Sequence, residues 1–217
     1  MTRFVPAAVK QPLRRWYFSH VLASALASVR SDGEATDDDL TRLRMGWAND
    51  GWDAKPVFLK EVISALKTTS GPVLECGSGL STVVMAALAP ERHRVSLENH
   101  ANWAHRVRGV LHEHGLTADV RVAPLTDRDG LHWYSAVGTL PTGIGLVICD
   151  GPDSYGRGRY PVLPLVRHNL APGAVILFDD AAAEGQPEVL DSWAREFDAR
   201  VDRRHLDGVD YAVVTVP

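Results

Sequence analysis

Short apolar runs and longer stretches with helical spacing alternate along the chain from Pro72 onward. The apolar runs are too short for helices and most of them end in polar or acidic residues, so we interpret them as buried strands. The predicted strands are Val73–Cys76, Arg94–Glu98, Asp119–Val122, Gly145–Asp150, Ala174–Asp179 and Val209–Val216, with a weaker one near Ala199–His205. Strands that alternate with helices predict an α/β fold with a doubly wound, mostly parallel seven-stranded sheet.

The segment between the last two predicted strands indicates a hairpin. Leu206-Asp207-Gly208 contains an Asp-Gly pair, which is a strong signal for a tight turn between antiparallel strands. We therefore expect an antiparallel C-terminal hairpin on the otherwise parallel sheet.

The first 70 residues are predicted to be helical. Thr36 followed by Asp39 is typical of a helix start, and Pro56 opens a further helix. We expect residues 1–70 to form a helical extension, or lid, packed on a domain of residues 71–217. Its segment 46–52 offers glycine hinges and aromatic surfaces that could cover a site. Alternatively, the tryptophans of this segment pin the helices to the sheet or to the second subunit of a homodimer.

The composition narrows the class of protein. Of the 217 residues 45% are hydrophobic and 23% are charged, and the net charge is −4, which argues against nucleic acid as the main partner. No apolar run approaches the length of a membrane span, and the N-terminus lacks the apolar stretch of a signal peptide. We expect a soluble, cytoplasmic protein with no membrane partner. Its two cysteines, Cys76 and Cys149, are expected to be buried and unpaired.

A glycine turn follows the first predicted strand and opens a helix. Gly77-Ser78-Gly79 lets the backbone approach a ligand closely, with helix amides directed at that ligand. A dinucleotide fingerprint would require a third glycine where this chain has Thr82. The acid before the turn, Glu75, would repel a phosphate. It favours a cationic or hydroxyl-bearing ligand instead.

Acidic residues recur where the predicted parallel strands end. These residues are Glu75, Glu98, Asp150, Asp179 and Asp180. One such acid is explained by capping of the next helix. Several acids on one edge, where open parallel sheets bind their ligands, favour a shared site. Glu98 follows Gly79 by 19 positions (98 − 79), a spacing at which a carboxylate accepts ribose hydroxyls in nucleotide-binding folds.

The segment Glu75-x-Gly77-x-Gly79 resembles the nucleotide-binding loop of class I S-adenosylmethionine-dependent methyltransferases, whose ligand carries a sulfonium, an ammonium and a ribose. The resemblance implies a Rossmann-like methyltransferase fold with S-adenosylmethionine as cofactor. The residues expected to hold it are Glu75, Gly77, Ser78, Gly79, Thr82, Glu98, Asn99, Leu125 and Asp150. Leu125 belongs to a predicted loop, Ala123–Leu125, around the adenine. Trp133 and Tyr134 either help to enclose the adenine or pack in the core.

Two later strand ends resemble the catechol O-methyltransferase branch of this family. That branch binds Mg²⁺ through an acid on the first strand and an Asp-Asn pair on the second. Asp150 and Asp179 match, and Asp180 stands in place of the asparagine. Oxygen ligands with open positions suit such a cation. The branch also has a lysine base at the position of Asp153, so a metal-free reaction stays an alternative.

These observations predict methyl transfer from S-adenosylmethionine to a hydroxyl of a small molecule, assisted by Mg²⁺. Asp150, Asp153 and Asp179 are the expected catalytic residues. Arg157 and Arg159 in a glycine-rich loop either clamp an anionic substrate or pair with the acids of the site. The alternatives are a metal-independent N- or O-methyltransferase, an NAD-dependent oxidoreductase and a non-catalytic nucleotide-binding module.

Overall fold

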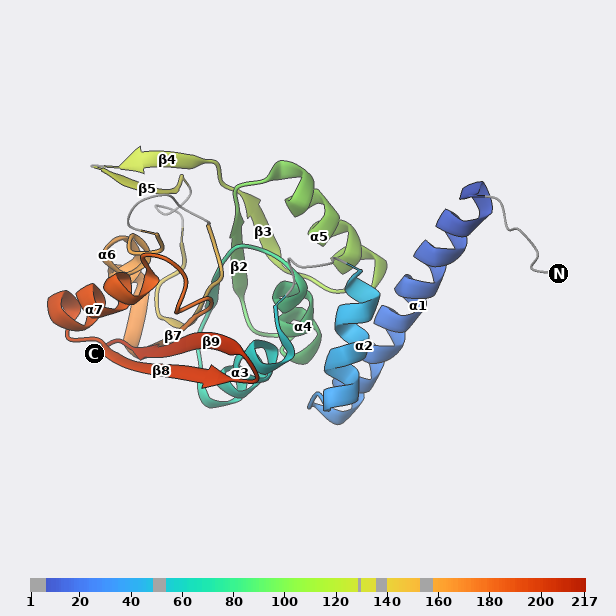
Figure 1. Cartoon of the computed structure of the whole chain (residues 1–217), viewed down its shortest axis with the longest axis horizontal. Coiled ribbons are helices and arrows are strands. Elements are labelled where there is room, and N and C mark those ends of the chain that lie inside the picture. Colours follow the sequence, from blue (N-terminus) through green and yellow to red (C-terminus); the bar gives the residue numbers. More distant parts are fainter. Residues whose placement is uncertain (1–6, 49–53, 129, 136–139, 153–157) are drawn as a thin grey trace.

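A computed structural model describes residues 7–48, 54–128, 130–135, 140–152 and 158–217. Its centre is a seven-stranded sheet in the order β3-β2-β1-β6-β7-β9-β8 (Figure 1). The strands are β1 Val73–Cys76, β2 Arg94–Glu98, β3 Asp119–Val122, β6 Ile144–Cys149, β7 Leu170–Phe178, β8 Arg200–Leu206 and β9 Val209–Thr215. The first five in sequence order run parallel, whereas β9 pairs antiparallel with both β7 and β8. This arrangement confirms the predicted mostly parallel sheet.

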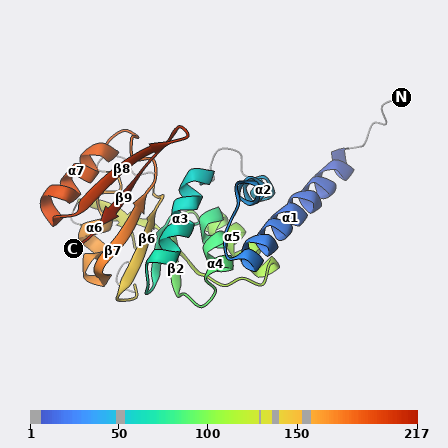
Figure 2. The same ribbon diagram turned by 90° about the horizontal axis from the view of Figure 1, so that it is seen from below.

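Helices cover both faces of the sheet (Figure 2). One face carries α3 Pro56–Thr68, α4 Leu80–Leu88 and α5 Ala101–Glu113, and the other carries α6 Val162–Val166 and α7 Gln186–Phe197. Successive residues of β6 point to opposite faces, so that Leu146 and Ile148 join the core under α3–α5 while Val147 and Cys149 join the other core. The doubly wound arrangement is therefore confirmed.

The C-terminal hairpin has the turn that its sequence indicated. Asp207 and Gly208 have φ angles of +51° and +73°, as a two-residue turn with positive φ at both central positions requires. Asp-Gly suits this turn because glycine, and to a lesser degree aspartate, tolerates the left-handed region.

A second, two-stranded sheet was not predicted. It consists of β4 Leu125–Arg128 and β5 Leu131–Tyr134, paired antiparallel. The expectation that Ala123–Leu125 forms a loop is wrong at Leu125, which begins β4 opposite Tyr134. Each strand has only four residues, which is too short for a clear two-residue period in the sequence.

The N-terminal segment forms two helices beside α4 and α5 at one end of the molecule (Figure 1). They are α1 Ala7–Asp32 and α2 Asp37–Trp47. The predicted start of α2 is confirmed, since Thr36 and Asp39 form a reciprocal capping box. Among the described residues, no helix is both long and apolar enough to cross a bilayer. Residues 49–52 of the predicted cover lie outside the described residues. The lid and the domain boundary near residue 70 stay predictions.

Trp47, at the end of α2, is buried rather than exposed above a site. Its side chain is 2% exposed, and its ring meets the Trp103 ring edge-on. The Arg106 guanidinium lies over both rings. These contacts support the alternative that this tryptophan pins the N-terminal helices to the body of the protein.

Gly46 generates the first testable prediction, because α1 and α2 cross there with little space. A Cβ added to Gly46 would lie 2.5 Å from the backbone nitrogen of Leu22. We expect Gly46→Ala to force α1 away and to lower the free energy of unfolding by about 1–3 kcal/mol, measured by urea denaturation.

Gly109→Ala is the matched control, since Gly109 is also helical and an added Cβ would meet no described atom within 4 Å. It should leave stability unchanged or raise it by up to about 1 kcal/mol. Equal effects of the two substitutions would contradict the close crossing.

Candidate active site

Three adjacent strands end at the same level and bring the glycine turn and the aspartates together. Cys76 of β1 lies opposite Cys149 of β6, and Cys149 lies opposite Phe178 of β7. The next residues along these strands are Gly77, Asp150 and Asp179. Because the strands are parallel, all three emerge at the carboxyl edge of the sheet, where ligands bind in such folds.

Glu75 lies beneath the glycine turn and not on its outer surface. Its side chain is fully buried and accepts hydrogen bonds from the hydroxyls of Ser81, Thr82 and Ser96. The Thr82 hydroxyl in turn accepts a hydrogen bond from the backbone N–H of Gly79 at 2.9 Å. This network ties β1, β2 and the first turn of α4 together, so Glu75 shapes the loop from below.

Burial raises the pKa of Glu75 to about 7. The three hydroxyl donors favour the ionised carboxylate and act in the opposite direction, but loss of hydration dominates. Glu75 is therefore close to its titration point at neutral pH.

Glu98 holds the central residue of the glycine turn. One of its carboxylate oxygens accepts hydrogen bonds from the Ser78 backbone N–H at 3.1 Å and the Ser78 hydroxyl at 3.0 Å. The other oxygen accepts from the backbone N–H of His100 at 2.9 Å. The indole N–H of Trp103 donates to the Ser78 carbonyl at 2.6 Å, so Ser78 is fixed from two sides.

The two glycines of the turn have different roles. Gly77 has a φ of +87°, and a Cβ there would lie 3.3 Å from the backbone of Asp150. Gly77 is therefore needed for its backbone conformation and for close packing against the end of β6. A Cβ on Gly79 would meet no described atom within 4 Å, so none of the described residues blocks a ligand on that side of the turn.

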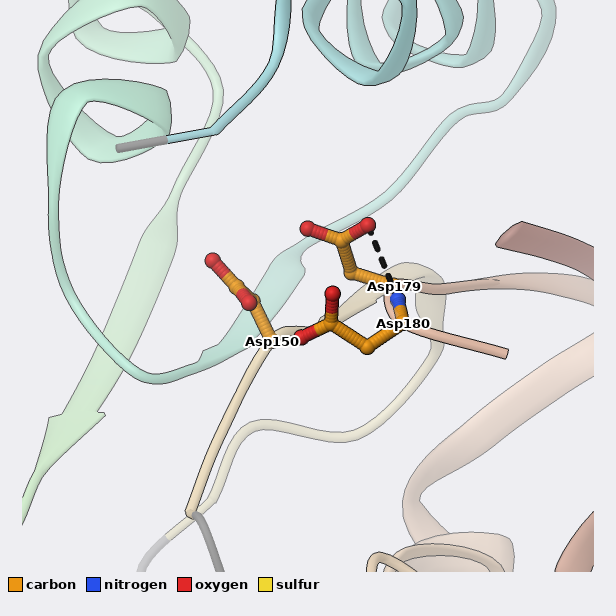
Figure 3. A group of neighbouring side chains, drawn as sticks. All are labelled: Asp150, Asp179 and Asp180. Carbon is orange, nitrogen blue, oxygen red and sulfur yellow. Dashed lines mark hydrogen bonds between the residues drawn. The ribbon is translucent and has the colours of Figure 1, made fainter. Parts of the chain in front are cut away.

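The carboxylates of Asp150, Asp179 and Asp180 lie next to one another (Figure 3). One oxygen from each residue lies within 4.8 Å of the others. The Asp180 backbone N–H donates to Asp179 at 2.9 Å. Asp180 has a φ of +50°, an uncommon angle for a residue other than glycine.

Arg159 is the buried positive charge beside this cluster, and the charge of Lys55 also acts on Asp179. The Arg159 guanidinium is buried and donates to the backbone carbonyls of Cys149 and Asp179. Its second terminal nitrogen lies 3.7 Å from the carboxylate of Asp150 and 3.4 Å from that of Asp180. Arg159 therefore pairs with the acids, as one of the two sequence-based alternatives proposed.

Burial raises the pKa of Asp150 and of Asp179 despite this arginine. Burial raises the pKa of Asp179 to about 6, and the nearby charge of Asp180 acts in the same direction. Burial, followed by the charge of Asp179, raises the pKa of Asp150 well above its usual range. The cluster consequently favours ligands that bring positive charge or share a proton.

The other predicted site residues lie outside the described residues, are half-buried beside the sheet, or pack in the core. Asp153 and Arg157 lie outside the described residues. Asn99, directly after β2, and Leu125, in β4, are half-buried. Trp133 and Tyr134 are fully buried in the core that contains α6 and α7, which supports core packing for both.

Three hydrogen bonds that shape the turn were not expected from the sequence. Ser81 and Ser96 donate to Glu75, and Trp103 donates to the Ser78 carbonyl. Ser96 lies opposite Glu75 in the parallel pairing of β1 with β2, so a polar residue inside an apolar strand was an available signal.

Comparison with known proteins decides the family. Residues 74–181, about half of the chain, match the model of a family described as a methyltransferase domain. This chain belongs to the class I S-adenosylmethionine-dependent methyltransferases. No curated protein sequence matches it.

Several solved structures share the fold of this methyltransferase. An O-methyltransferase from Bacillus cereus in complex with SAH is 17% identical with a TM-score of 0.61, over 84% of this chain and 92% of that one. TomG from Streptomyces achromogenes, an O-methyltransferase in complex with SAM, is 16% identical with a TM-score of 0.57, over 82% and 87%. A precorrin-6y C5,15-methyltransferase from Geobacter metallireducens is 13% identical with a TM-score of 0.59, over 78% and 92%. The fold therefore does not select the acceptor atom.

The buried carboxylate of Glu75 predicts a specific pH dependence of stability. Its pKa is about 7 in the folded protein and 4.5 in the unfolded chain. Between these values the folded state keeps a proton that the unfolded state has lost, so Glu75 makes stability fall as pH rises. The unfolding free energy of the wild type minus that of Glu75→Gln should therefore fall as pH rises, by up to about 1.4 kcal/mol per pH unit.

Urea denaturation from pH 4.5 to pH 7.5 measures this difference. Glu188→Gln is the control, because Glu188 is exposed on α7, and its curve should parallel that of the wild type. If the unfolding free energies of wild type and Glu75→Gln change with pH in parallel, burial does not raise the pKa of Glu75.

Proposed function

We propose that this methyltransferase transfers the methyl group of S-adenosylmethionine to a hydroxyl oxygen of a small-molecule acceptor, with assistance from Mg²⁺. The observation that carries the proposal is the grouping of Asp150, Asp179 and Asp180 on the same sheet edge as the glycine turn. Donor and acceptor can meet there, which is the main requirement for a direct displacement.

The donor would lie on the open side of the glycine turn, near Gly79. Glu98 has about four acceptor positions, of which Ser78 and His100 use three. One ribose hydroxyl can therefore donate to Glu98 directly, and a second can donate if the Ser78 hydroxyl turns away. Asn99 and Leu125 stay in the proposal as neighbours of the adenine, on the family resemblance alone.

Glu75 supports the donor indirectly. Both of its oxygens already accept hydroxyl hydrogen bonds from the protein. We therefore assign to Glu75 and Thr82 the shape of the turn, and to Gly77, Ser78 and Gly79 the contact with the donor. Asp150, at the end of the neighbouring strand, faces both the donor and the acceptor.

The aspartate cluster fits a hard divalent cation. Its candidate ligands are carboxylate oxygens within 4.8 Å of one another, the ligand type that Mg²⁺ prefers. Three carboxylates and the Arg159 guanidinium sum to a charge of about −2 when ionised, which one divalent cation balances. Bound there, Mg²⁺ would act as a Lewis acid that lowers the pKa of an acceptor hydroxyl.

A metal-independent route is the second candidate function, and the pKa of Asp179 favours it. A carboxylate with a pKa of about 6 can accept a proton from an acceptor group near neutral pH. Asp153 stays a sequence-based candidate for this base. The cytoplasmic location and the homodimer also stay predictions from the sequence.

Donor binding is tested by the thermal midpoint of unfolding. S-adenosylmethionine should raise the midpoint, because a ligand that binds the folded state stabilises it, whereas NAD should not. Glu98→Gln should reduce the shift, and the exposed control Glu188→Gln should keep it. A shift with NAD and none with S-adenosylmethionine would overturn the donor assignment.

Metal assistance is tested with methyl-labelled S-adenosylmethionine and a panel of vicinal diols and single hydroxyl acceptors. Turnover should fall at least about tenfold after chelation and return with Mg²⁺. Asp179→Asn should lack turnover even when Mg²⁺ is present, while the exposed control Asp191→Asn should respond to chelation and to Mg²⁺ as the wild type does. Turnover that survives complete chelation would exclude the metal and favour Asp179 as base.

A further inference from the structure

Arg159 is held rigidly beneath the aspartate cluster. Its side chain is 2% exposed, and the guanidinium stacks on the Phe178 ring with 5.5 Å to the ring centroid. The following residue, Tyr160, accepts a hydrogen bond from the Trp193 indole at 3.0 Å. These contacts keep the guanidinium from turning outward to bind a substrate.

The guanidinium joins the ends of two strands. It donates to the carbonyl of Cys149, the last residue of β6, and to the carbonyl of Asp179, directly after β7. The same group lies within 4 Å of the carboxylates of Asp150 and Asp180. An arginine buried in this way is costly unless its charge is compensated, and here the compensating charges are the candidate metal ligands.

We propose that Arg159 is a positioning residue that acts as the fixed counter-charge of the Asp150–Asp179–Asp180 cluster and sets its preference for a divalent cation. The inference rests on the metal site of the proposed function. Without the arginine the ionised cluster would carry about −3 and would favour a trivalent ion. With it, the charge is about −2 and matches one divalent ion. The hydrogen bonds to the strand ends also keep the carboxylates at their present spacing.

The ratio of two ion affinities separates this charge effect from a merely structural one. Mn²⁺ and Tb³⁺ are each titrated alone into chelator-stripped, full-length protein and followed by calorimetry. Arg159→Met should raise the preference for Tb³⁺ over Mn²⁺ at least about tenfold, since a nearby positive charge repels the trivalent ion more strongly. Arg159→Lys should keep the wild-type preference.

A charge-balanced variant provides the matched test. Arg159→Met combined with Asp180→Asn returns the cluster to about −2, and its ion preference should return to within about threefold of the wild type. Arg203→Met is the control, because Arg203 is exposed on the edge strand β8 and pairs with Asp191 of α7. An unchanged preference in Arg159→Met would overturn the proposal, because loss of structure alone weakens both ions together.

A measurement without metal tests the counter-charge role of Arg159 independently of the proposed Mg²⁺ site. In chelator, Arg159→Met should raise the equilibrium constant of unfolding at least about tenfold more in the wild-type background than in the Asp150→Asn/Asp180→Asn background, where the acids that need compensation are gone. Equal increases in the two backgrounds would overturn the counter-charge role. If wild type binds neither ion while this coupling is present, the metal of the proposed function and the ion preference both fail, and the counter-charge role of Arg159 stands. Should Arg159→Met not fold, Arg159→Gln against Arg159→Lys gives the same comparison.

Discussion

The aligned carboxyl ends of three parallel strands determine where the residues of the site lie. Cys76, Cys149 and Phe178 face one another across β1, β6 and β7. The chain leaves the sheet directly after each of them, so a flexible turn and two acids meet without any long loop to place them. A slip of one residue in either pairing would move these side chains to the other face of the sheet. The hydrophobic cores on both faces fix the pairing and therefore fix the site.

Because its charged side chains are buried, the site is ordered and each charge requires a compensating partner. Two glutamates support the glycine turn through hydrogen bonds with serine and threonine hydroxyls and backbone amides, and an arginine lies under the aspartates. Each buried charge thus has compensating partners at short range, as buried charges require. The turn and the cluster are consequently preorganised before any ligand arrives, which reduces the ordering that binding must impose.

The sequence predicted the elements whose signals are local. Buried strands show as apolar runs, Asp207-Gly208 marks a turn, and Thr36 with Asp39 marks a helix start. The β4–β5 hairpin was missed because its strands are too short to show a period. The partners of Glu75 and the burial of Arg159 depend on which strands become neighbours and on how a loop returns to the sheet. Such contacts follow from tertiary packing, and only the opposition of Glu75 and Ser96 could have been derived from strand pairing.

The left-handed backbone of Asp180 restricts which residues can stand at that position. Aspartate, asparagine and glycine tolerate a φ of +50° far better than other residues. Asparagine could therefore replace Asp180 with no change of backbone, and the cluster would lose one negative charge at constant shape. Related enzymes can thus change the charge of this site by a single base change in the codon. We would expect an acid at position 180 to occur together with a cation at position 159 in evolution, and an amide at position 180 to release that constraint.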